Sequence, residues 1–383
     1  MVFLNNFWRR IGIVGKKSAI VAAVIAAIVA IGVALAAFQP WVVVPPENSG
    51  DGGTIIANGT EPAPKEIVSI ASERSAFPLV QRWASEYNND ENALATVEVS
   101  YYLDKPPTPS DLVIVGDIRH TSNESNYVPV SAQAVAVVYN IPSFPDIPAG
   151  MKLNASVLSS IFNGTITKWN DPAIKSLNSD LNLPSERIIV VHENSNSSSL
   201  TILEKYISDG IHWPKNGVSA LGPDELAATI RKTPYSIGYV DFSFATQTRM
   251  TFAAIGNPNG GYVLPSMDSI GQALNSSIHV QNVTNINQTV ALTPPFLNAS
   301  MLSNGSYPLT ALYYASFPAN TSNETRNGTL DFVRWVIDKD RGQQTLSEVQ
   351  YPSIYQENGA LTTYAGTIIN STTPRASKNL MNN

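Results

Sequence analysis

Short apolar runs alternate with amphipathic helical patterns between residues 67 and 345, and this alternation limits the fold more than any other feature of the sequence. The apolar runs have the length and composition of buried strands: Ile67–Ile70, Val97–Tyr101, Leu112–Val115, Ala134–Tyr139, Ile188–Val191, Ile237–Val240 and Leu312–Ala315. Helical spacing of apolar residues occurs at Phe77–Tyr87, Ser156–Phe162, Leu200–Ser208 and Leu330–Thr345. Strands that alternate with helices predict an α/β fold with mainly parallel strand pairing.

A separate apolar run extends from Ser18 to Phe38 and has the length of about 20 residues that a membrane-spanning helix needs. Four cations precede it: Arg9, Arg10, Lys16 and Lys17. This charged flank predicts that residues 1–17 stay in the cytoplasm and that the rest of the chain lies outside. The run is either a retained anchor or a signal cleaved near Ala34–Ala36. Its length favours the anchor, because the apolar core of a signal is usually about 7–15 residues.

Residues 39–65 are rich in Pro, Gly and Asn, and they predict an extended spacer between the membrane and a globular body. The body carries many Asn-x-Ser/Thr sequons, which are densest between Asn275 and Asn327. They predict a glycosylated surface outside the cytoplasm, and together with the absence of cysteine they suggest an archaeal cell surface. The polar stretch Asn275–Asn304 has little periodicity, so we expect an insertion or a long surface loop there.

Composition argues against several classes of site and partner. The absence of cysteine removes disulfides, thiol nucleophiles, Fe–S clusters and Cys-based zinc sites. The 4 histidines form no His-x-x-x-His pair, so no His-rich metal centre is expected. A net charge of -6 without a basic stripe argues against a nucleic-acid partner.

Two hydroxyl-rich turns, each between a predicted strand and a predicted helix, are candidate anion sites. They are Ser72–Pro78, where we expect Ser75 to cap the helix, and His192–Ser199. Ordinary helix capping is the simpler explanation for one such turn, whereas two in one α/β chain favour a ligand site. Asp117 follows the strand Leu112–Val115, and it either faces a crevice at the carboxyl ends of the strands or caps a turn.

An enzyme is not expected. Ser197, His192 and Glu193 contain the side chains of a catalytic triad, but all three lie in one short turn-forming segment. The chain also has no Gly-x-Ser-x-Gly nucleophile elbow.

Four segments match, in order, the signatures of one protein family: Asn140–Pro142, Leu158–Ile174, Thr233–Phe242 and Asp331–Gln344. The most specific is Leu158–Ile174, which reads LSSIFNGTITKWNDPAI. Over roughly residues 67–354 the chain resembles the PstS-like phosphate-binding proteins of ABC transporters. The resemblance implies a two-lobed, type II periplasmic-binding-protein-like fold that closes on its ligand, with no cofactor and no catalysis. It also implies an ABC permease as the partner.

Combined with the membrane segment, the resemblance divides the chain and places hinges near Asn140 and Ala315. The predicted parts are 1–17, a cytoplasmic segment; 18–38, a transmembrane anchor or signal; 39–65, a linker; 66–139, the first part of lobe 1; 140–314, lobe 2; 315–369, the second part of lobe 1; and 370–383, a tail.

The resemblance implies phosphate or a related oxyanion as the ligand. The family's Thr-Phe pair falls on Ala76-Phe77, its buried Asp on Asp117, and its Ser-Gly-Thr on Ser197–Ser199. An ionised Asp only accepts hydrogen bonds, so it favours protonated phosphate over sulfate. With the two turns added, the predicted ligand-binding residues are Ser75, Ala76, Phe77, Asp117, Ser195, Ser197, Ser198 and Ser199.

The chain departs from the family pattern at three places. The family's Arg, a clamp for oxyanions, is replaced by Glu193, which would repel an anion. The segment Tyr101–Ser110 is short and proline-rich, so it lacks the family's Ser-bearing loop and helix. Asn196 forms a sequon inside the second turn. Arg74 and Arg119 are candidates for the replacement cation.

Two functions therefore remain. The leading prediction is a membrane-anchored, extracytoplasmic solute-binding protein that delivers phosphate or a related oxyanion to an ABC permease. The alternative is a glycosylated surface or adhesion protein that keeps the fold with a degenerate site. Glu193 and the missing loop favour the alternative, whereas Asp117 and Ser197–Ser199 favour binding.

Overall fold

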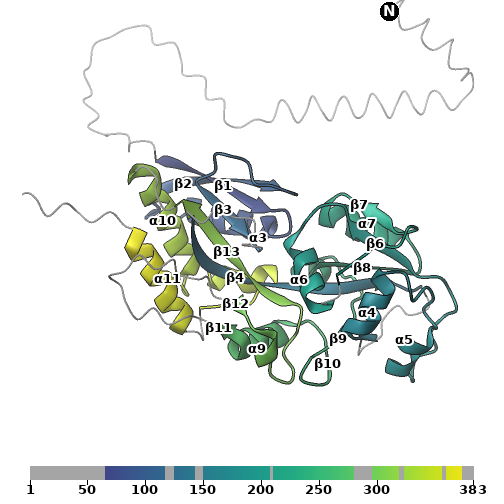
Figure 1. Cartoon of the computed structure of the whole chain (residues 1–383). Coiled ribbons are helices and arrows are strands. Elements are labelled where there is room, and N and C mark those ends of the chain that lie inside the picture. Colours follow the sequence, from purple (N-terminus) through teal and green to yellow (C-terminus); the bar gives the residue numbers. More distant parts are fainter. Residues whose placement is uncertain are drawn as a thin grey trace, which may run out of the picture. The chain divides into compact units, whose positions relative to one another are not determined.

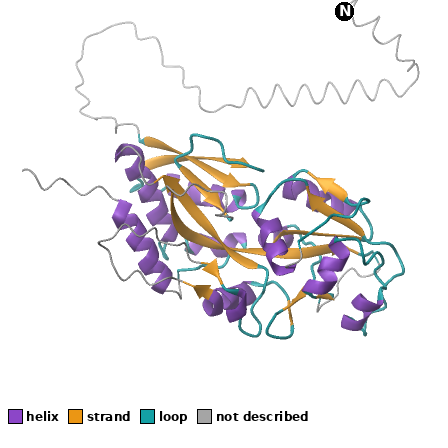
Figure 2. Ribbon diagram, in the orientation of Figure 1, coloured by secondary structure: helices purple, strands orange, loops and turns teal. Residues whose placement is uncertain are grey.

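A mixed sheet forms the centre of the fold, with helices packed against it (Figure 1, Figure 2). The computed structural model describes residues 65–116, 125–142, 150–207, 210–279, 296–318, 323–355 and 359–372, which belong to one compact unit. The predicted membrane segment at 18–38 lies outside these ranges. Within them, no helix is both long enough and apolar enough to cross a bilayer.

The central sheet has eight strands in the order β2-β1-β3-β13-β4-β8-β6-β7. They are β1 (Glu66–Glu73), β2 (Ala95–Tyr102), β3 (Leu112–Val115), β4 (Ser125–Asn140), β6 (Ile189–Glu193), β7 (Val218–Ala220), β8 (Ser236–Asp241) and β13 (Thr310–Pro318). Two small sheets consist of β5 (Lys152–Leu153), β9 (Ala254–Gly256) and β10 (Tyr262–Val263), and of β11 (Ile278–His279) with β12 (Phe296–Leu297).

The pairing of the strands is mixed, so the prediction of mainly parallel pairing is wrong for the middle of the sheet. Strand β1 runs parallel to β2 and β3, and β6 runs parallel to β7 and β8. In the middle, β13 is antiparallel to β3 and β4, and β4 is antiparallel to β8. The directions of these middle strands depend on long connections, which the local alternation of apolar runs does not encode.

The long strand β4 joins the two halves of the sheet. It pairs with β13 over Ser125–Ala134 and with β8 over Val135–Asn140. The sequence predicted only its second half, because Pro129 argues against a central strand. In the structure the register shifts beside this proline, between Tyr313 and Tyr314 on β13. The shift is the kind of irregularity at which a sheet tolerates a proline.

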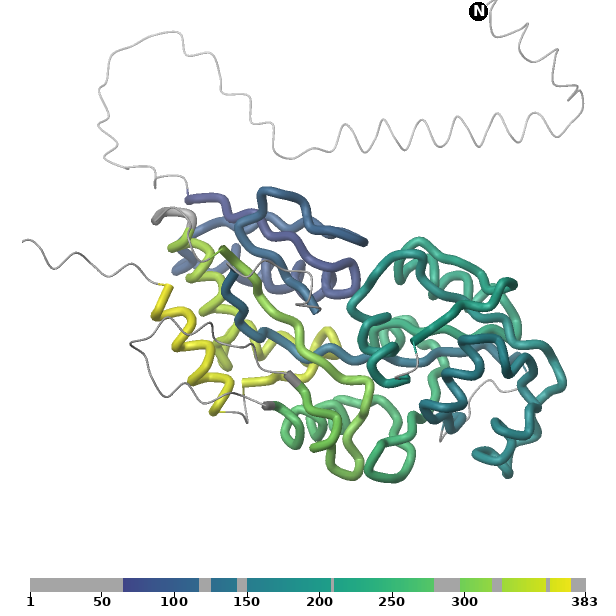
Figure 3. The backbone as a smooth tube through the Cα atoms, in the orientation of Figure 1, coloured from purple at the N-terminus to yellow at the C-terminus, as the bar shows by residue number. Residues whose placement is uncertain are grey.

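The helices divide between the two halves of the sheet. They are α3 (Phe77–Asn88), α4 (Ala155–Phe162), α5 (Pro172–Leu177), α6 (Ser198–Ile207), α7 (Gly222–Lys232), α8 (Phe242–Gln247), α9 (Met267–Ser277), α10 (Asn323–Ile337) and α11 (Gly359–Thr372), with 3-10 turns η2 (Ala299–Met301) and η3 (Gln344–Val349). Helices α3 and α10 pack on β1 and β2, and α7 packs on β6 and β8. The colours of Figure 3 show that the two ends of this unit build one half together, whereas the teal middle of the chain builds the other.

Most of the predicted elements are confirmed, with ends displaced by a few residues. The helix predicted at Leu330–Thr345 is the main error, because α10 ends at Ile337. After it the chain turns back so tightly that a Cβ on Gly342 would lie 2.5 Å from the carbonyl oxygen of Val336. The predicted loop at Asn275–Asn304 contains the end of α9, the β11–β12 pair and η2, while residues 280–295 lie outside the described ranges. The predicted division into lobes stays a prediction.

Three of the signature segments meet in the structure around the backbone of Tyr235. The Asn140 side chain donates to the carbonyl oxygens of Ile230 and Thr233 at the end of α7, at 2.9 and 3.3 Å. The indole Nε1–H of the fully buried Trp169 donates to the Tyr235 carbonyl at 3.0 Å. Tyr235 itself has a φ of 63°, in the left-handed region that non-glycine residues rarely adopt. The signatures therefore build a structural junction.

Trp169→Ala should lower the free energy of unfolding by about 3–5 kcal/mol, because it leaves a large cavity and removes the indole hydrogen bond at this junction. Urea unfolding of the full chain measures the loss. Trp213→Ala is the matched control, because Trp213 is half-buried and stacks on the side chain of His192. Equal losses in the two variants would contradict the structural role assigned to Trp169.

Candidate ligand-binding site

A pocket of about 300 Å³ opens between the turn after β1, the loop after β2 and the turn before α6. Six of the predicted residues line it: Arg74, Ser75, Ser195, Ser197, Ser198 and Ser199. Ala76 and Phe77 begin α3 beside it, and their N–H groups donate to the carbonyl oxygens of Glu73 and Arg74. The predicted Asp117 and Arg119 lie outside the described residues. The structure thus brings the two hydroxyl-rich turns to one cavity.

The second turn forms the N-terminus of α6. The Ser197 hydroxyl accepts a hydrogen bond from the N–H of Leu200 at 3.1 Å, and the Ser197 carbonyl accepts one from Thr201 at 3.1 Å. Ser197 therefore caps the helix, as Ser residues commonly do. Ser198 and Ser199 follow in the first turn and are buried against the sheet. This turn carries the N–H groups that have no partner within the helix, together with the positive end of the helix dipole.

Two glutamates share the pocket with these serines. The Glu73 carboxylate, at the end of β1, accepts hydrogen bonds from the Ser198 hydroxyl and, at 3.0 Å, from the N–H of Gly116. The Glu193 carboxylate, at the end of β6, accepts a hydrogen bond from the Ser197 hydroxyl. Each carboxylate thus accepts the one hydrogen bond that a serine hydroxyl can donate.

Burial alters the acidity of Glu193, whose exposed fraction is only 4%. Removal from water, together with the negative charge of Glu73, raises the pKa of Glu193 to about 7, against the lowering effect of the Ser197 hydrogen bond. Glu193 therefore gains a proton near neutral pH. The sequence predicted a permanent negative charge at this position, which repels an anion.

Gln133 lies behind the serines and was not predicted as a site residue. Its side chain is fully buried on β4, and its Nε2 donates to the Ser198 hydroxyl at 2.6 Å and to that of Ser199 at 3.4 Å. The available signal was an amide directly before the apolar run Ala134–Tyr139, because a buried amide needs partners. Glu73 carries a signal too, because it follows the predicted strand Ile67–Ile70 as Asp117 follows Leu112–Val115.

The Ser75 side chain does not cap α3, which corrects the prediction. The N-cap residue is Ala76, with no side-chain cap, and the Ser75 hydroxyl instead accepts a hydrogen bond from Tyr313 at 3.0 Å. The hydroxyls of Tyr313 and Tyr351 also lie 3.3 Å from the carboxylate of Asp241. The Ser75 hydroxyl thus serves as an acceptor for Tyr313, and it makes no hydrogen bond to the N-terminus of α3.

The carboxyl group of Asp241 at the end of β8 is 1% exposed. Burial raises its pKa to about 7, although hydrogen bonds from the Ser243 N–H and the two tyrosines act in the opposite direction. Asp241 also caps α8 through the Ser243 N–H at 2.9 Å. It therefore joins both halves of the sheet to the turn that carries Ser75.

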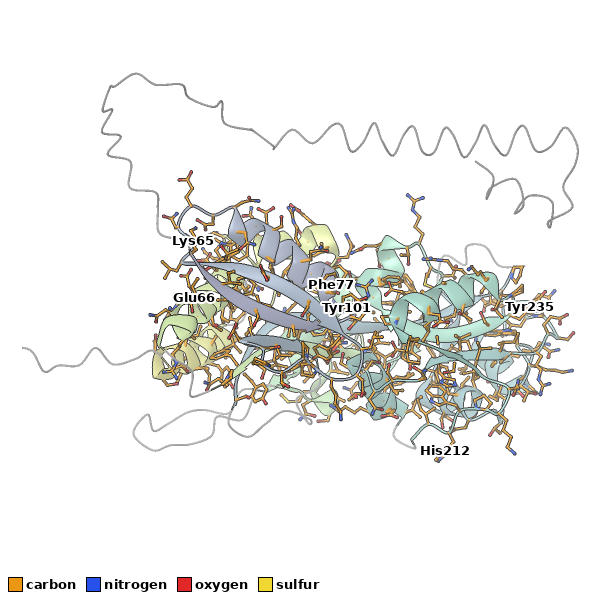
Figure 4. All side chains as sticks on the ribbon, turned by 90° about the horizontal axis from the view of Figure 1, so that it is seen from above. Lys65, Glu66, Phe77, Tyr101, His212 and Tyr235 are labelled. Carbon is orange, nitrogen blue, oxygen red and sulfur yellow. The ribbon has the colours of Figure 1, made fainter. Side chains whose placement is uncertain are left out.

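Arg74 is the only cation among the described residues that line the pocket. Its Nε–H donates to the Asp224 carboxylate of α7 at 2.7 Å. Its guanidinium lies 4.6 Å from the ring centre of Tyr101 and 5.5 Å from that of Phe77. Figure 4 shows these two aromatic residues side by side. The side chain is thus held between a carboxylate and two rings at the pocket wall.

His192 and Ser197 are not arranged as members of a catalytic triad. The His192 ring stacks on Trp213, with 4.4 Å between ring centres, and its Nδ1 lies 2.9 Å from the Glu193 carbonyl oxygen. The Ser197 hydroxyl donates to Glu193 instead. Among the described contacts, His192 and Ser197 therefore do not form the hydrogen bond that a triad requires.

Comparisons with known proteins agree with this fold. A family model described as a PBP superfamily domain matches residues 102–340, so the chain belongs to that superfamily of binding proteins. A phosphate-binding protein PstS from Pasteurella multocida is 30% identical over 76% of this chain and 87% of its own length. A second PstS, from Xylella fastidiosa, is 27% identical over 80% of this chain and 87% of its own length. Within the superfamily, the chain belongs to the PstS family.

Solved structures confirm the type II periplasmic-binding-protein-like fold. A high affinity periplasmic phosphate-binding protein, solved with phosphate at pH 8.5, matches with a TM-score of 0.57 and 12% identity over 81% of this chain and 99% of its own. A protein from Clostridium perfringens, assigned as a phosphate ABC transporter substrate-binding protein and solved with bound phosphate, matches with a TM-score of 0.52 and 14% identity over 75% of this chain and 99% of its own.

Proposed function

We propose that this chain is an extracytoplasmic solute-binding protein that captures phosphate, or a related oxyanion, for delivery to an ABC permease. The observation that carries the proposal is the pocket itself. The N-terminus of α6, with Ser197, Ser198 and Ser199, meets the turn that carries Ser75 at one cavity. A helix N-terminus stabilises a bound oxyanion through its N–H groups and its dipole. The likeness to phosphate-binding PstS proteins supports phosphate as the ligand.

In this proposal the apolar run at 18–38 anchors the protein, and residues 39–65 hold the binding unit away from the membrane. The sequons would carry glycans on the outer face. The two lobes, joined near Asn140 and Ala315, close on the ligand. The permease recognises the closed form, and no cofactor or chemical step takes part.

Calorimetric titration of the full-length chain in mild detergent, with phosphate, sulfate and arsenate, tests the proposal. Phosphate and arsenate should bind, and sulfate should bind about 10- to 100-fold more weakly, because sulfate brings no proton for a hydrogen bond to the charged Asp117. Asp117→Asn should reduce this discrimination. The absence of binding heat with all three anions, from a folded sample, would favour the alternative of a surface protein with a degenerate site.

Arg74 is proposed as the cation that replaces the family's Arg. Its ion pair with Asp224 uses Nε–H, and a guanidinium carries four further N–H donors. Arg74→Gln should therefore weaken phosphate binding about tenfold, the size of one charge-assisted hydrogen bond. Lys175→Gln on α5 removes an exposed positive charge and is the control. Unchanged affinity in Arg74→Gln would exclude Arg74 as the replacement cation.

A further inference from the structure

We propose that Glu193 is a ligand-binding residue that works in its protonated form, so that the protein takes up one proton with each phosphate it binds. The inference rests on the proposed function and adds a mechanism of recognition to it. In this view Glu193, which occupies the position of the family's Arg, does not repel the anion. It supplies a hydrogen-bond donor there instead.

The position of Glu193 makes it part of the binding surface. It lines the pocket at the end of β6, four residues before the serine that caps α6. Its carboxylate contacts the Ser197 hydroxyl, and the salt bridges among the described residues do not include Glu193. An ionised carboxylate with this little exposure and no cationic partner is costly, and a bound anion beside it would add repulsion. Protonation removes both costs.

The number of hydrogen-bond donors on Glu193 and Ser197 also favours a protonated Glu193. A serine hydroxyl can donate one hydrogen bond, and Ser197 donates it to Glu193. While Glu193 is ionised, the pair therefore offers only acceptor oxygens to the pocket. A proton on Glu193 gives the pair two O–H groups. One maintains the contact between the two side chains, and the other donates to a phosphate oxygen.

The groups around Glu193 favour this uptake of a proton. At the end of β1 and in the turn after it they are Glu73 and Arg74, of which Arg74 is paired with Asp224 of α7. On β8, the Tyr239 hydroxyl accepts from the N–H of Glu193 at 3.4 Å. The remaining groups are Asp104 on the loop after β2, His192 on β6 itself, and Glu204 of α6, which acts on Tyr239. Burial and the negative charge of Glu73 therefore both favour the protonated form of Glu193, and they raise its pKa to about 7.

Calorimetry of the full chain in two buffers with different ionisation heats counts the protons directly. At pH 8, wild type should take up close to one more proton per phosphate than Glu193→Gln, whose amide is a permanent donor. The proton exchange measured with the variant comes from the ionisation of phosphate itself. This part is the same in both proteins, so it cancels in the difference. Above pH 7, the ratio of wild-type to variant association constants should fall about tenfold per pH unit, the slope for one linked proton. Glu98→Gln, at an exposed site on β2, should behave as wild type.

The outcomes separate the two proposals. Phosphate binding by wild type with no proton uptake beyond that of Glu193→Gln would overturn the role of Glu193 and leave the proposed function intact. If Glu193→Gln does not fold, calorimetry of wild type at pH 8 still tests the inference, because proton release or no exchange there contradicts it. No phosphate binding by wild type or variant between pH 5.5 and 8.5, at concentrations up to about 1 mM, would overturn both proposals.

Discussion

Gly116→Ala is expected to damage both the stability of the protein and its binding of phosphate. Gly116 follows β3 behind the pocket, and its N–H donates to Glu73. A Cβ at this position would lie 2.3 Å from Oε1 of Gln133 and 2.6 Å from Cβ of Ser198. Both neighbours are buried, so the added methyl group must displace the first turn of α6 or the strand β4. Overpacking of this kind costs about 1–3 kcal/mol.

The same displacement should weaken phosphate binding at least about tenfold, because the hydroxyls and N–H groups of α6 no longer meet the turn after β1. Urea unfolding and phosphate titration of the full chain measure the two effects. Gly271→Ala, on α9, is the matched control, because a Cβ there meets no atom within 4 Å. That change should leave binding unaltered and should stabilise the helix by up to about 1 kcal/mol. Normal stability and affinity in Gly116→Ala would contradict the close packing behind the pocket.

Asp241→Asn is expected to remove a large part of the dependence of stability on pH. Burial raises the pKa of Asp241 from 3.8 to about 7, so folding favours the protonated carboxyl. Its contribution to stability is complete below pH 4 and disappears as the pH rises through 7. The difference between these pKa values corresponds to an upper limit of roughly 4 kcal/mol. An Asn side chain at this position still has an oxygen that can accept the Ser243 N–H and cap α8, but it does not ionise.

Urea unfolding at pH 5 and pH 8 tests this prediction. Wild type should lose roughly 2–4 kcal/mol more than Asp241→Asn over this interval. Glu193 changes stability in the same direction, but it is present in both proteins and cancels in the comparison. Asp180→Asn, at an exposed position, controls for the loss of one carboxylate. The same dependence on pH in wild type and Asp241→Asn would show that Asp241 is not held as the structure describes.

The sequence revealed those elements whose information is local. The apolar run Leu112–Val115 coincides with β3, and the spacing of Phe77–Tyr87 predicts α3 to within one residue. The first half of β4 was missed because Pro129 and the polar residues near it do not resemble a strand. Their place in the sheet depends on β13, which lies almost 200 residues further along the chain, and local periodicity does not report such a partner.

The prediction of the candidate site was limited in the same way, because sequence patterns report local contacts and not distant ones. Ser197 was predicted because it belongs to a hydroxyl-rich turn directly before a predicted helix, and this pattern is local in the sequence. Gln133 and Asp241 were missed because their partners, Ser198 and Tyr313, come from distant segments. Glu193 was recognised, but its role was interpreted from its charge alone. Its burial, which decides whether it carries that charge, is a property of the folded chain.

A crystal structure of the full chain grown with arsenate near pH 6 tests the proposed site most directly, because the anomalous scattering of arsenic locates the anion. We expect one arsenate at the N-terminus of α6, within hydrogen-bond distance of Ser197, Ser199 and Glu193. An arsenate bound elsewhere, with this pocket free of it at saturating concentration, would contradict the claim that the chain captures phosphate at this site.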